Sequence, residues 1–389
     1  MMNAQHTSRP KLIVFLGTAH DNGGTSILAS NLAAAMRKQG HRVEEWYLFS
    51  SDGDLPPGAR VFYHTKRTPF ALLTVFWRVV TALRREKVDV LLGLQPLSNL
   101  LVGLAGWIAG VRNRVSAYHG PFWSANQTLM NLDALVASLG VYTRMIACSN
   151  SVADSFRARS KAYDPLAVVV NGQNAPRLFP RAQARAELGL PADGFILGQI
   201  GRLSHQKNQG FSLDLMTDLK HELPQAQLVL LGIGPDESAV RAQIAAAGIA
   251  DRVRIIPAVA HDRIGLFYSA VDLVLFPSRY EGLSLAAIEA VHAGVPLLCT
   301  DIPSFQELFA PSPYLTKTLL LPLAEPAAWR ARICELLTNG AVRARVGTEL
   351  AQLSPSYGFD TMAKQYLQLI DPNKAPADAP LRGAVHSGV

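Results

Sequence analysis

Short apolar runs alternate with amphipathic segments along this chain, and the alternation limits the fold to few classes. Strands are predicted at 11–16, 42–48, 89–94, 115–118, 145–148 and 167–170. Helices are predicted between them, including 26–39, which ends at Gly40, and 99–109. Strands that alternate with helices are typical of a parallel sheet covered by helices.

A second series of the same kind follows a break. Residues 171–191 are rich in Pro, Asn and Gly, which predicts a connector with a short helix at its end. Further strands are predicted at 195–200, 227–231, 253–256, 273–276 and 296–299. A helix is expected at 358–370, and the Pro/Ala/Gly-rich residues 371–389 are expected to be a disordered tail. With 389 residues, the chain has room for two Rossmann-like domains in tandem, whose facing ligand edges would form a cleft.

Charge is distributed unevenly over the two series. Residues 1–170 contain 18 basic and 10 acidic side chains, whereas the rest contains 19 and 20, so the net charge of +7 comes from the first half. A basic half suggests an anionic partner, either nucleic acid or a membrane surface. Nucleic acid is disfavoured, because no nucleic-acid-binding fold or aromatic platform accompanies the charge.

One helical segment in the basic half has two interpretations. Its apolar positions, Leu72, Leu73, Phe76, Val80 and Leu83, follow helical spacing. Basic residues flank them at Lys66, Arg67, Arg78, Arg84, Arg85 and Lys87. The helix either packs into the core with a solvated cationic end, or lies on an anionic membrane beside a lipid-linked acceptor.

The remaining composition favours a cytoplasmic protein, either soluble or peripheral at the inner face of the plasma membrane. The apolar stretch 97–111 is shorter than the roughly 20 residues that span a bilayer. It predicts a buried helix, with a re-entrant membrane segment as the alternative. Cys148, Cys299 and Cys334 are too few and too scattered for a disulfide framework or a zinc site, which fits a reducing compartment.

The first glycine-rich loop runs from Gly17 to Gly24, between a predicted strand and helix. It matches neither the dinucleotide fingerprint nor a Walker A loop. Gly23 and Gly24 would let the backbone approach a ligand, and the free N–H groups of the helix would face an anion. A tight turn with positive φ is the alternative explanation for these glycines.

Two further loops carry charged residues at predicted strand ends. After 195–200 comes Gly201, with Arg202 and Lys207 bracketing the loop, either aimed at one phosphate cluster or simply solvated. After 273–276 comes the segment Pro277–Ala290, in which Glu281 precedes an apolar helix and Glu289 lies inside it. A buried carboxylate needs a partner or a ligand. The free N–H groups of Gly282, Leu283 and Ser284 would face a phosphate or sugar hydroxyls. A structural ion pair is the alternative.

At these residues the sequence resembles the retaining GT-B glycosyltransferases of family 4, also called glycosyl transferases group 1. The loop 201–208 and the pair Glu281 and Glu289, separated by seven residues, are the most specific features. Shorter segments occur in the family's order. They are Gly23-Gly24, Tyr118-His119-Gly120, Ala147-Cys148-Ser149, Val170-Asn171-Gly172, Gly232-Ile233-Gly234-Pro235 and Ala293-Gly294-Val295-Pro296.

The resemblance implies an α/β GT-B fold with two facing domains. Residues 1–172, completed by 355–370, would form the acceptor domain, and 173–354 the nucleotide-sugar domain. It also implies roles for individual residues. Arg202 and Lys207 would hold the donor diphosphate, Glu281 the sugar hydroxyls and Glu289 the ribose. Gly24 would approach the phosphate through its N–H, and His119 would lie near the reacting sugar.

The implied reaction retains the anomeric configuration and uses neither a metal nor a cofactor. No Asp-x-Asp motif occurs, and the two cations with a helix N-terminus would stabilise the departing diphosphate. The sequence departs from the family at 257–259, which read Pro-Ala-Val, and at Thr25-Ser26. The base and the identity of the acceptor therefore stay open. The resemblance implies transfer from a nucleotide diphosphate sugar to a saccharide or lipid-linked saccharide in the synthesis of a bacterial surface polysaccharide.

Two other functions share this pattern of residues. A sugar-nucleotide epimerase would have the same two domains but would need additional acid/base groups. A non-catalytic sugar- or lipid-binding relative would have no reason to keep all four charged residues. A nicotinamide dehydrogenase is disfavoured, because no glycine loop has the required spacing.

Overall fold

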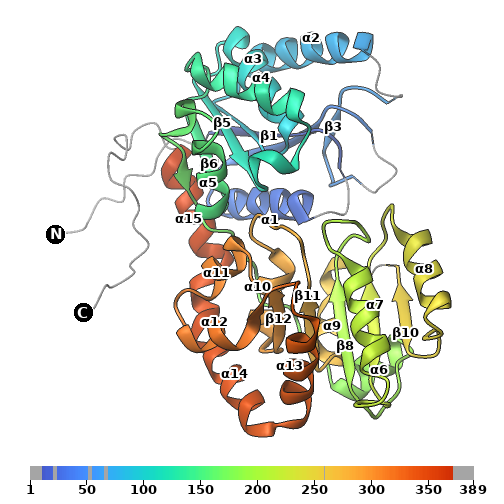
Figure 1. Ribbon diagram of the computed structural model, residues 1–389. Helices are drawn as coiled ribbons and strands as arrows, with labels where there is room; N and C mark the ends of the chain where they lie inside the picture. The colour runs from blue at the N-terminus through green and yellow to red at the C-terminus, as the bar shows by residue number, and fades with distance from the viewer. Residues whose placement is uncertain (1–10, 21–23, 51–54, 65–68, 258, 371–389) are drawn as a thin grey trace, which may run out of the picture. The chain divides into compact units, whose positions relative to one another are not determined.

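The computed structural model describes residues 11–20, 24–50, 55–64, 69–257 and 259–370. These residues divide into two compact units (Figure 1). Unit 1 contains the described residues up to Val170 and from Asp360 onward, and unit 2 contains Asn171–Phe359. Gly23, Lys66, Arg67, Ala258 and the tail 371–389, on which expectations were placed, lie outside the described residues.

Unit 1 is built on a parallel sheet. In its described part, seven strands pair in the order β3-β2-β1-β4-β5-β6-β7. They are β1 (Leu12–Gly17), β2 (Arg42–Tyr47), β3 (Arg60–Val61), β4 (Val90–Gly93), β5 (Asn113–Tyr118), β6 (Arg144–Ala147) and β7 (Ala167–Val168). From β1 the chain moves outward to β2 and β3, then returns to β4 on the other side of β1, so the strand order switches between β1 and β4.

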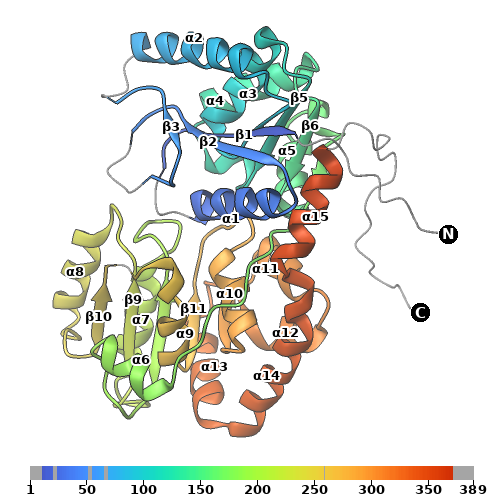
Figure 2. The same cartoon turned by 180° about the vertical axis from the view of Figure 1, so that it is seen from behind.

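Helices cover both faces of this sheet. They are α1 (Gly24–Lys38), α2 (Pro69–Glu86), α3 (Pro96–Ala109), α4 (Gln127–Ser138), α5 (Asn150–Arg157) and α15 (Phe359–Ile370). Helices α2, α3 and α4 lie side by side over one face, and α1 lies on the other (Figures 1 and 2). The fully buried Tyr366 of α15 lies near Cys148, so the last helix returns to unit 1, as the predicted fold class requires.

Unit 2 has a second parallel sheet. In its described part, six strands pair in the order β10-β9-β8-β11-β12-β13, and the order switches between β8 and β11. The strands are β8 (Ile196–Ile200), β9 (Gln227–Leu231), β10 (Val253–Ile256), β11 (Leu273–Phe276), β12 (Leu297–Thr300) and β13 (Leu320–Leu321). The helices are α6 (Arg181–Glu187), α7 (Gln209–Asp218), α8 (Glu237–Ala246), α9 (Gly265–Ala270), α10 (Leu285–Ala293), α11 (Pro303–Phe309), α12 (Pro313–Leu319), α13 (Pro326–Thr338) and α14 (Gly340–Leu353).

Every strand that the sequence predicts is present, with its ends within two residues of the expected ones. Central strands such as β4, β8, β11 and β12 are buried along almost their whole length, because helices cover both faces of a parallel sheet. Burial on both faces explains why these strands are mostly apolar, with Gln199 in β8 and Thr300 in β12 as buried polar exceptions. The two strands that the sequence misses, β3 and β13, are two-residue edge strands formed by pairing to β2 and β12.

Helix α2 is present, but the single apolar stripe expected on it is wrong. The structure buries Val80 and Leu83, whereas Leu72 and Leu73 are exposed. Two rows of apolar residues share the helix, and the inward row repeats every four residues, at Val75, Val79 and Leu83. The core-packing interpretation therefore describes this inward row only.

Helix α3 confirms the buried helix predicted for 97–111, with two exceptions. Pro96 opens it and Gly110, at φ 78°, ends it in the left-handed conformation that glycine tolerates. Eight of its residues are buried, but Leu104 and Trp107 face outward. Within the described part of the chain, no helix combines the length and the apolarity needed to cross a bilayer.

Candidate functional site

The two charged motifs of unit 2 meet at the point where its strand order switches. Loop 201–208 follows β8, and the segment 277–284 follows β11, which pairs with β8. The Lys207 ammonium donates to Glu281 Oε1 at 2.5 Å, with the two side chains only 15% and 6% exposed. Ligands of open α/β sheets bind at this kind of position, beyond the carboxyl ends of the strands. The pair is therefore placed where a ligand is expected.

Two neutral side chains complete the surroundings of the Glu281 carboxylate. The buried Ser278 hydroxyl donates to Oε1 at 2.8 Å, and Gln206 Nε2 donates to Oε2 at 3.4 Å. Gln206 also donates to the carbonyl of Tyr280 at 3.0 Å, which ties the two loops together. The sequence did not predict Ser278 or Gln206 as site residues, because neither carries a charge that marks it.

Glycines bring the loops after β8 and β9 into backbone contact. Gly201 has φ 135°, and a Cβ there would lie 3.0 Å from Lys207 Cε. At Gly232, φ is 146°, and a Cβ would lie 2.2 Å from the carbonyl oxygen of Gly201. At Gly234 it would lie 2.1 Å from the carbonyl oxygen of Leu203. Only glycine fits these positions, so the segment Gly232–Pro235 supports the lysine-bearing loop.

Arg202 occupies the start of the same loop. Its side chain is exposed, and its carbonyl oxygen accepts hydrogen bonds from Gln209 Nε2 at 3.0 Å and from the Ser204 hydroxyl at 3.3 Å. Its backbone is thus fixed at the start of the loop. Lys207 lies near the end of the same loop and forms a direct ion pair with Glu281.

Glu289 lies on α10, five residues after Ser284, and is 7% exposed. Tyr268 Oη is 2.8 Å from Glu289 Oε2, and Gln173 Nε2 donates to Oε1 at 3.4 Å. Burial raises the pKa of Glu289 from 4.5 to about 7, and the Tyr268 hydrogen bond only partly offsets it. Near neutral pH this carboxyl is therefore poised between its two protonation states.

The hydroxyl of Tyr268 also lies 2.9 Å from the carbonyl oxygen of Ala286. A phenol has one proton, and a carbonyl can only accept. When Tyr268 donates to Ala286, Glu289 satisfies the second contact by donating its own proton to Tyr268. The two contacts of the Tyr268 hydroxyl are thus compatible with either protonation state of Glu289, and it is burial that raises the pKa of this carboxyl.

The third part of the predicted site is the segment of Gly282, Leu283 and Ser284, which leads directly into the N-terminus of α10. Ser284 is the N-cap, and its side chain makes no capping hydrogen bond. Its Oγ is buried, and no hydrogen-bond partner for it is present in the described part of the chain. The carbonyl of Leu283 accepts from Asn171 Nδ2 at 3.3 Å. This hydrogen bond from Asn171 therefore holds the backbone just before α10.

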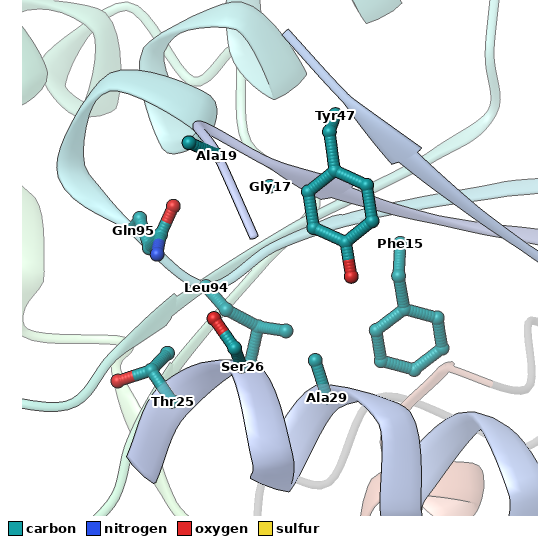
Figure 3. A pocket seen from close by; sticks show the side chains of 9 residues that line it. All are labelled: Phe15, Gly17, Ala19, Thr25, Ser26, Ala29, Tyr47, Leu94 and Gln95. Atoms are coloured by element: carbon teal, nitrogen blue, oxygen red, sulfur yellow. The ribbon is translucent and has the colours of Figure 1, made fainter. Parts of the chain in front are cut away.

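Unit 1 has a small pocket at its own switch point, between the ends of β1 and β4 (Figure 3). Gly17 closes β1 against the Tyr47 ring, because a Cβ there would lie 2.8 Å from that ring. Gln95 Oε1 accepts from the N–H of Thr18 at 2.7 Å and joins the two loops. The pocket is lined by Phe15, Gly17, Ala19, Thr25, Ser26, Ala29, Tyr47, Leu94 and Gln95. Of these lining residues, the sequence analysis had singled out only those of the glycine-rich loop and Thr25-Ser26.

The two unit 1 residues with predicted roles lie at the same edge of that sheet. Gly24 is exposed and is the first residue of α1. His119 directly follows β5 and is partly buried. Both therefore stand at carboxyl ends of strands, where the sequence predicted them.

Comparison with known proteins defines the class. HepE of Anabaena, solved in complex with UDP and glucose, has a TM-score of 0.78 at 20% identity, covering 92% of this chain and 98% of that chain. Two parallel α/β units with loops at switch points have the architecture of the GT-B glycosyltransferases, to which such structural neighbours belong.

Two models of protein families match this sequence and show which family it belongs to. The model described as Glycosyltransferase Family 4 matches residues 22–175, and the one described as Glycosyl transferases group 1 matches 180–352. The chain belongs to this family of glycosyltransferases.

Two curated relatives show how far the likeness extends. The lipopolysaccharide core biosynthesis mannosyltransferase LpsB of Rhizobium meliloti is 34% identical over 40% of this chain and 46% of that protein. A D-inositol 3-phosphate glycosyltransferase of Mycobacteroides abscessus is 31% identical over 71% of this chain and 66% of that protein. The chain thus spans about half of the first relative and about two thirds of the second.

Proposed function

We propose that this protein is a retaining glycosyltransferase that moves a hexosyl group from a nucleotide diphosphate sugar to an acceptor hydroxyl. The observation that carries the proposal is the Lys207–Glu281 pair at the β8/β11 switch point, with Glu289 buried in the helix that follows. A diphosphate attracts cations, whereas sugar and ribose hydroxyls donate to carboxylates. The site offers both kinds of group side by side, and the family membership supports the same reaction.

The donor diphosphate would bind between the two cations of loop 201–208. Lys207 would turn its ammonium from Glu281 toward the phosphates, and the exposed Arg202 guanidinium would bind them with two parallel N–H groups. Gly201 and the N–H groups of Gly282, Leu283 and Ser284 would let the backbone approach. The N–H of Gly24, with Gly23 before it, would add a phosphate contact from unit 1.

Once Lys207 moves to the phosphates, Glu281 becomes a hydrogen-bond acceptor for the donor sugar. Ser278 and Gln206 would keep its carboxylate oriented. Glu289 would accept from the ribose hydroxyls, which requires the ionised carboxylate. Binding of the donor should therefore release protons near neutral pH, because about half of the Glu289 carboxyls are protonated at the pKa of about 7.

The proposed step breaks the bond between the anomeric carbon and the phosphate oxygen. A bond to the acceptor oxygen forms on the same face of the sugar, and the acceptor proton passes to the departing phosphate oxygen. Arg202, Lys207 and the N-terminus of α10 would stabilise the charge that develops on the diphosphate. In this scheme neither a metal nor a cofactor takes part.

The acceptor would be a saccharide, lipid-linked in the synthesis of a bacterial surface polysaccharide. The pocket of unit 1 lies at a switch point and offers Tyr47, Gln95 and Ser26 as polar groups for a sugar. His119 would contact the reacting sugar or the acceptor. The mannosyltransferase LpsB, named for lipopolysaccharide core synthesis, supports this acceptor class. The reaction would take place at the cytoplasmic side of the membrane.

Product analysis by NMR tests the proposal. The protein is incubated with each of a panel of UDP-, GDP- and ADP-sugars, with and without saccharide acceptors and with and without EDTA. The proposal expects acceptor-dependent release of nucleoside diphosphate, a product with the donor's anomeric configuration, and activity that EDTA leaves intact. An inverted product or loss of activity with EDTA would overturn the mechanism. Donor epimerisation without acceptor would establish the epimerase instead.

A further inference from the structure

Exposed apolar side chains are concentrated on the three helices that cover one face of the unit 1 sheet. Twelve large hydrophobic side chains are exposed in the described residues. Seven of them belong to α2, α3 and α4, and an eighth, Leu139, directly follows α4. These helices are only 18, 14 and 12 residues long. We define the outer apolar face by six of these residues, Leu73, Trp77, Leu104, Trp107, Leu135 and Leu139.

The three helices form one continuous layer. Helix α3 packs against α2 on one side and α4 on the other (Figure 1). A Cβ at Gly103 would lie 2.8 Å from Val136, so glycine allows α3 and α4 to approach closely. The Arg84 guanidinium donates to the carbonyl of Ile108 at 2.8 Å and joins the ends of α2 and α3. The residues of the outer apolar face therefore lie on one packed layer of helices.

The two tryptophans make this surface unusual for a solvent-facing helix layer. Trp77 is 52% exposed and Trp107 is 62% exposed. Single exposed leucines are common on protein surfaces, but contiguous apolar patches mark sites of interaction. Tryptophan is the residue most typical of the boundary between water and lipid, because its ring is apolar and its N–H is polar.

On the three helices themselves, the exposed charge has one sign. The three helices contain two carboxylates, and neither is available to oppose an anion. Glu86 is paired with Arg60 at 3.2 Å, and Asp133 is buried among the hydroxyls of Tyr118, Tyr142 and Tyr163. Exposed cations gather at the shared end of α2 and α3. They are Arg84, Arg85, Lys87 and Arg112.

We infer that the outer apolar face is a docking surface for an anionic lipid bilayer. Its apolar side chains would enter the interface while the arginines and the lysine meet the lipid phosphates. A second copy of the chain fits less well, because the three helices offer no available carboxylate to meet these cations, whereas anionic lipid offers phosphates. This inference goes beyond the proposed transfer reaction and does not depend on it.

Co-sedimentation of the full-length protein with vesicles tests the inference. Phosphatidylcholine vesicles with and without phosphatidylglycerol are compared for wild type, for Trp77→Ser with Trp107→Ser, and for Arg85→Gln with Arg112→Gln. Each double variant should weaken binding to the anionic vesicles by about tenfold or more, and wild type should bind neutral vesicles far less. Leu178→Ser, an equally exposed apolar residue of unit 2, is the matched control and should bind like wild type.

Two results would overturn the inference. One is equal vesicle binding by wild type and the tryptophan variant. The other is a wild-type dimer, measured by light scattering without lipid, that the tryptophan variant converts to a monomer, because a second copy would then cover the face. Circular dichroism confirms that each variant is folded. Stabilisation by a nucleotide sugar should be the same in all variants, which separates a failure here from a failure of the proposed reaction.

Discussion

At the residue scale, Glu289 is where the proposed function and stability oppose each other. Its carboxyl is 7% exposed and its pKa is raised to about 7. In the unfolded chain it ionises above 4.5, whereas in the folded protein it stays neutral up to about 7. Stability from this residue is therefore full below 4.5 and is lost as the pH rises through 7, by about 3 kcal/mol.

Replacement of Glu289 by glutamine should make the protein more stable at alkaline pH. At pH 8 we expect Glu289→Gln to raise the free energy of unfolding by up to about 3 kcal/mol, because the amide has no charge to desolvate. At pH 5 the gain should nearly vanish. Urea denaturation at the two pH values measures it. The same gain at both values would contradict the pKa assignment, and donor binding should be weakened throughout.

The Lys207–Glu281 pair predicts a strong energetic coupling. Lys207→Met leaves a carboxylate that is 6% exposed without its cation, which should lower the free energy of unfolding by about 3 kcal/mol. Adding Glu281→Gln should restore most of this loss, since the remaining group is then neutral. Urea denaturation of the two single variants and the double variant gives the coupling.

The matched control for this cycle is an exposed ion pair on α8. Arg241 and Glu237 are 59% and 36% exposed, so Arg241→Met should cost at most about 0.5 kcal/mol. If Lys207→Met and Arg241→Met lower the free energy of unfolding equally, Lys207 and Glu281 do not form a buried pair.

At the element scale, the loops of unit 2 are positioned by backbone contacts that only glycine permits. Gly234→Ala would place a Cβ 2.1 Å from the carbonyl oxygen of Leu203 and displace the loop that carries Lys207. We expect a loss of about 2 kcal/mol in stability and weaker donor binding.

Gly347 supplies a control with the opposite sign. It lies inside α14 with no neighbour within 4 Å of a Cβ, so Gly347→Ala should stabilise the protein by about 0.5–1 kcal/mol. Thermal denaturation compares the two variants. A neutral Gly234→Ala would mean that the loops do not need this close contact.

These elements also show what the sequence could predict. Burial on both faces makes the central strands mostly apolar runs, and the charged loops follow them directly, so strands and loops were both predictable. Tyr268 and Gln173 were not, because Gln173 lies 116 residues from Glu289 and neither residue is marked by charge. The sequence also could not show which of the two rows of residues on α2 faces the core, since both rows are apolar.

At the scale of the whole molecule, the structure shows where the charge difference between the two halves of the chain lies. The surplus of the first 170 residues includes the cations at the shared end of α2 and α3, beside the outer apolar face. The near-neutral second half holds the donor loops, with Lys207 and Glu281 compensating each other. The proposed nucleotide site in unit 2 and the proposed membrane surface on unit 1 therefore fall in separate units, and variants can address one without the other.

The central claim is that unit 2 binds a nucleotide diphosphate sugar through Lys207, Glu281 and Glu289. The most direct measurement is the thermal shift of the wild-type protein with a panel of UDP-, GDP- and ADP-sugars, repeated with Glu289→Ala. We predict that at least one nucleotide sugar raises the unfolding temperature of wild type and that Glu289→Ala abolishes the shift. No shift with any donor, or an equal shift in the variant, would contradict the account.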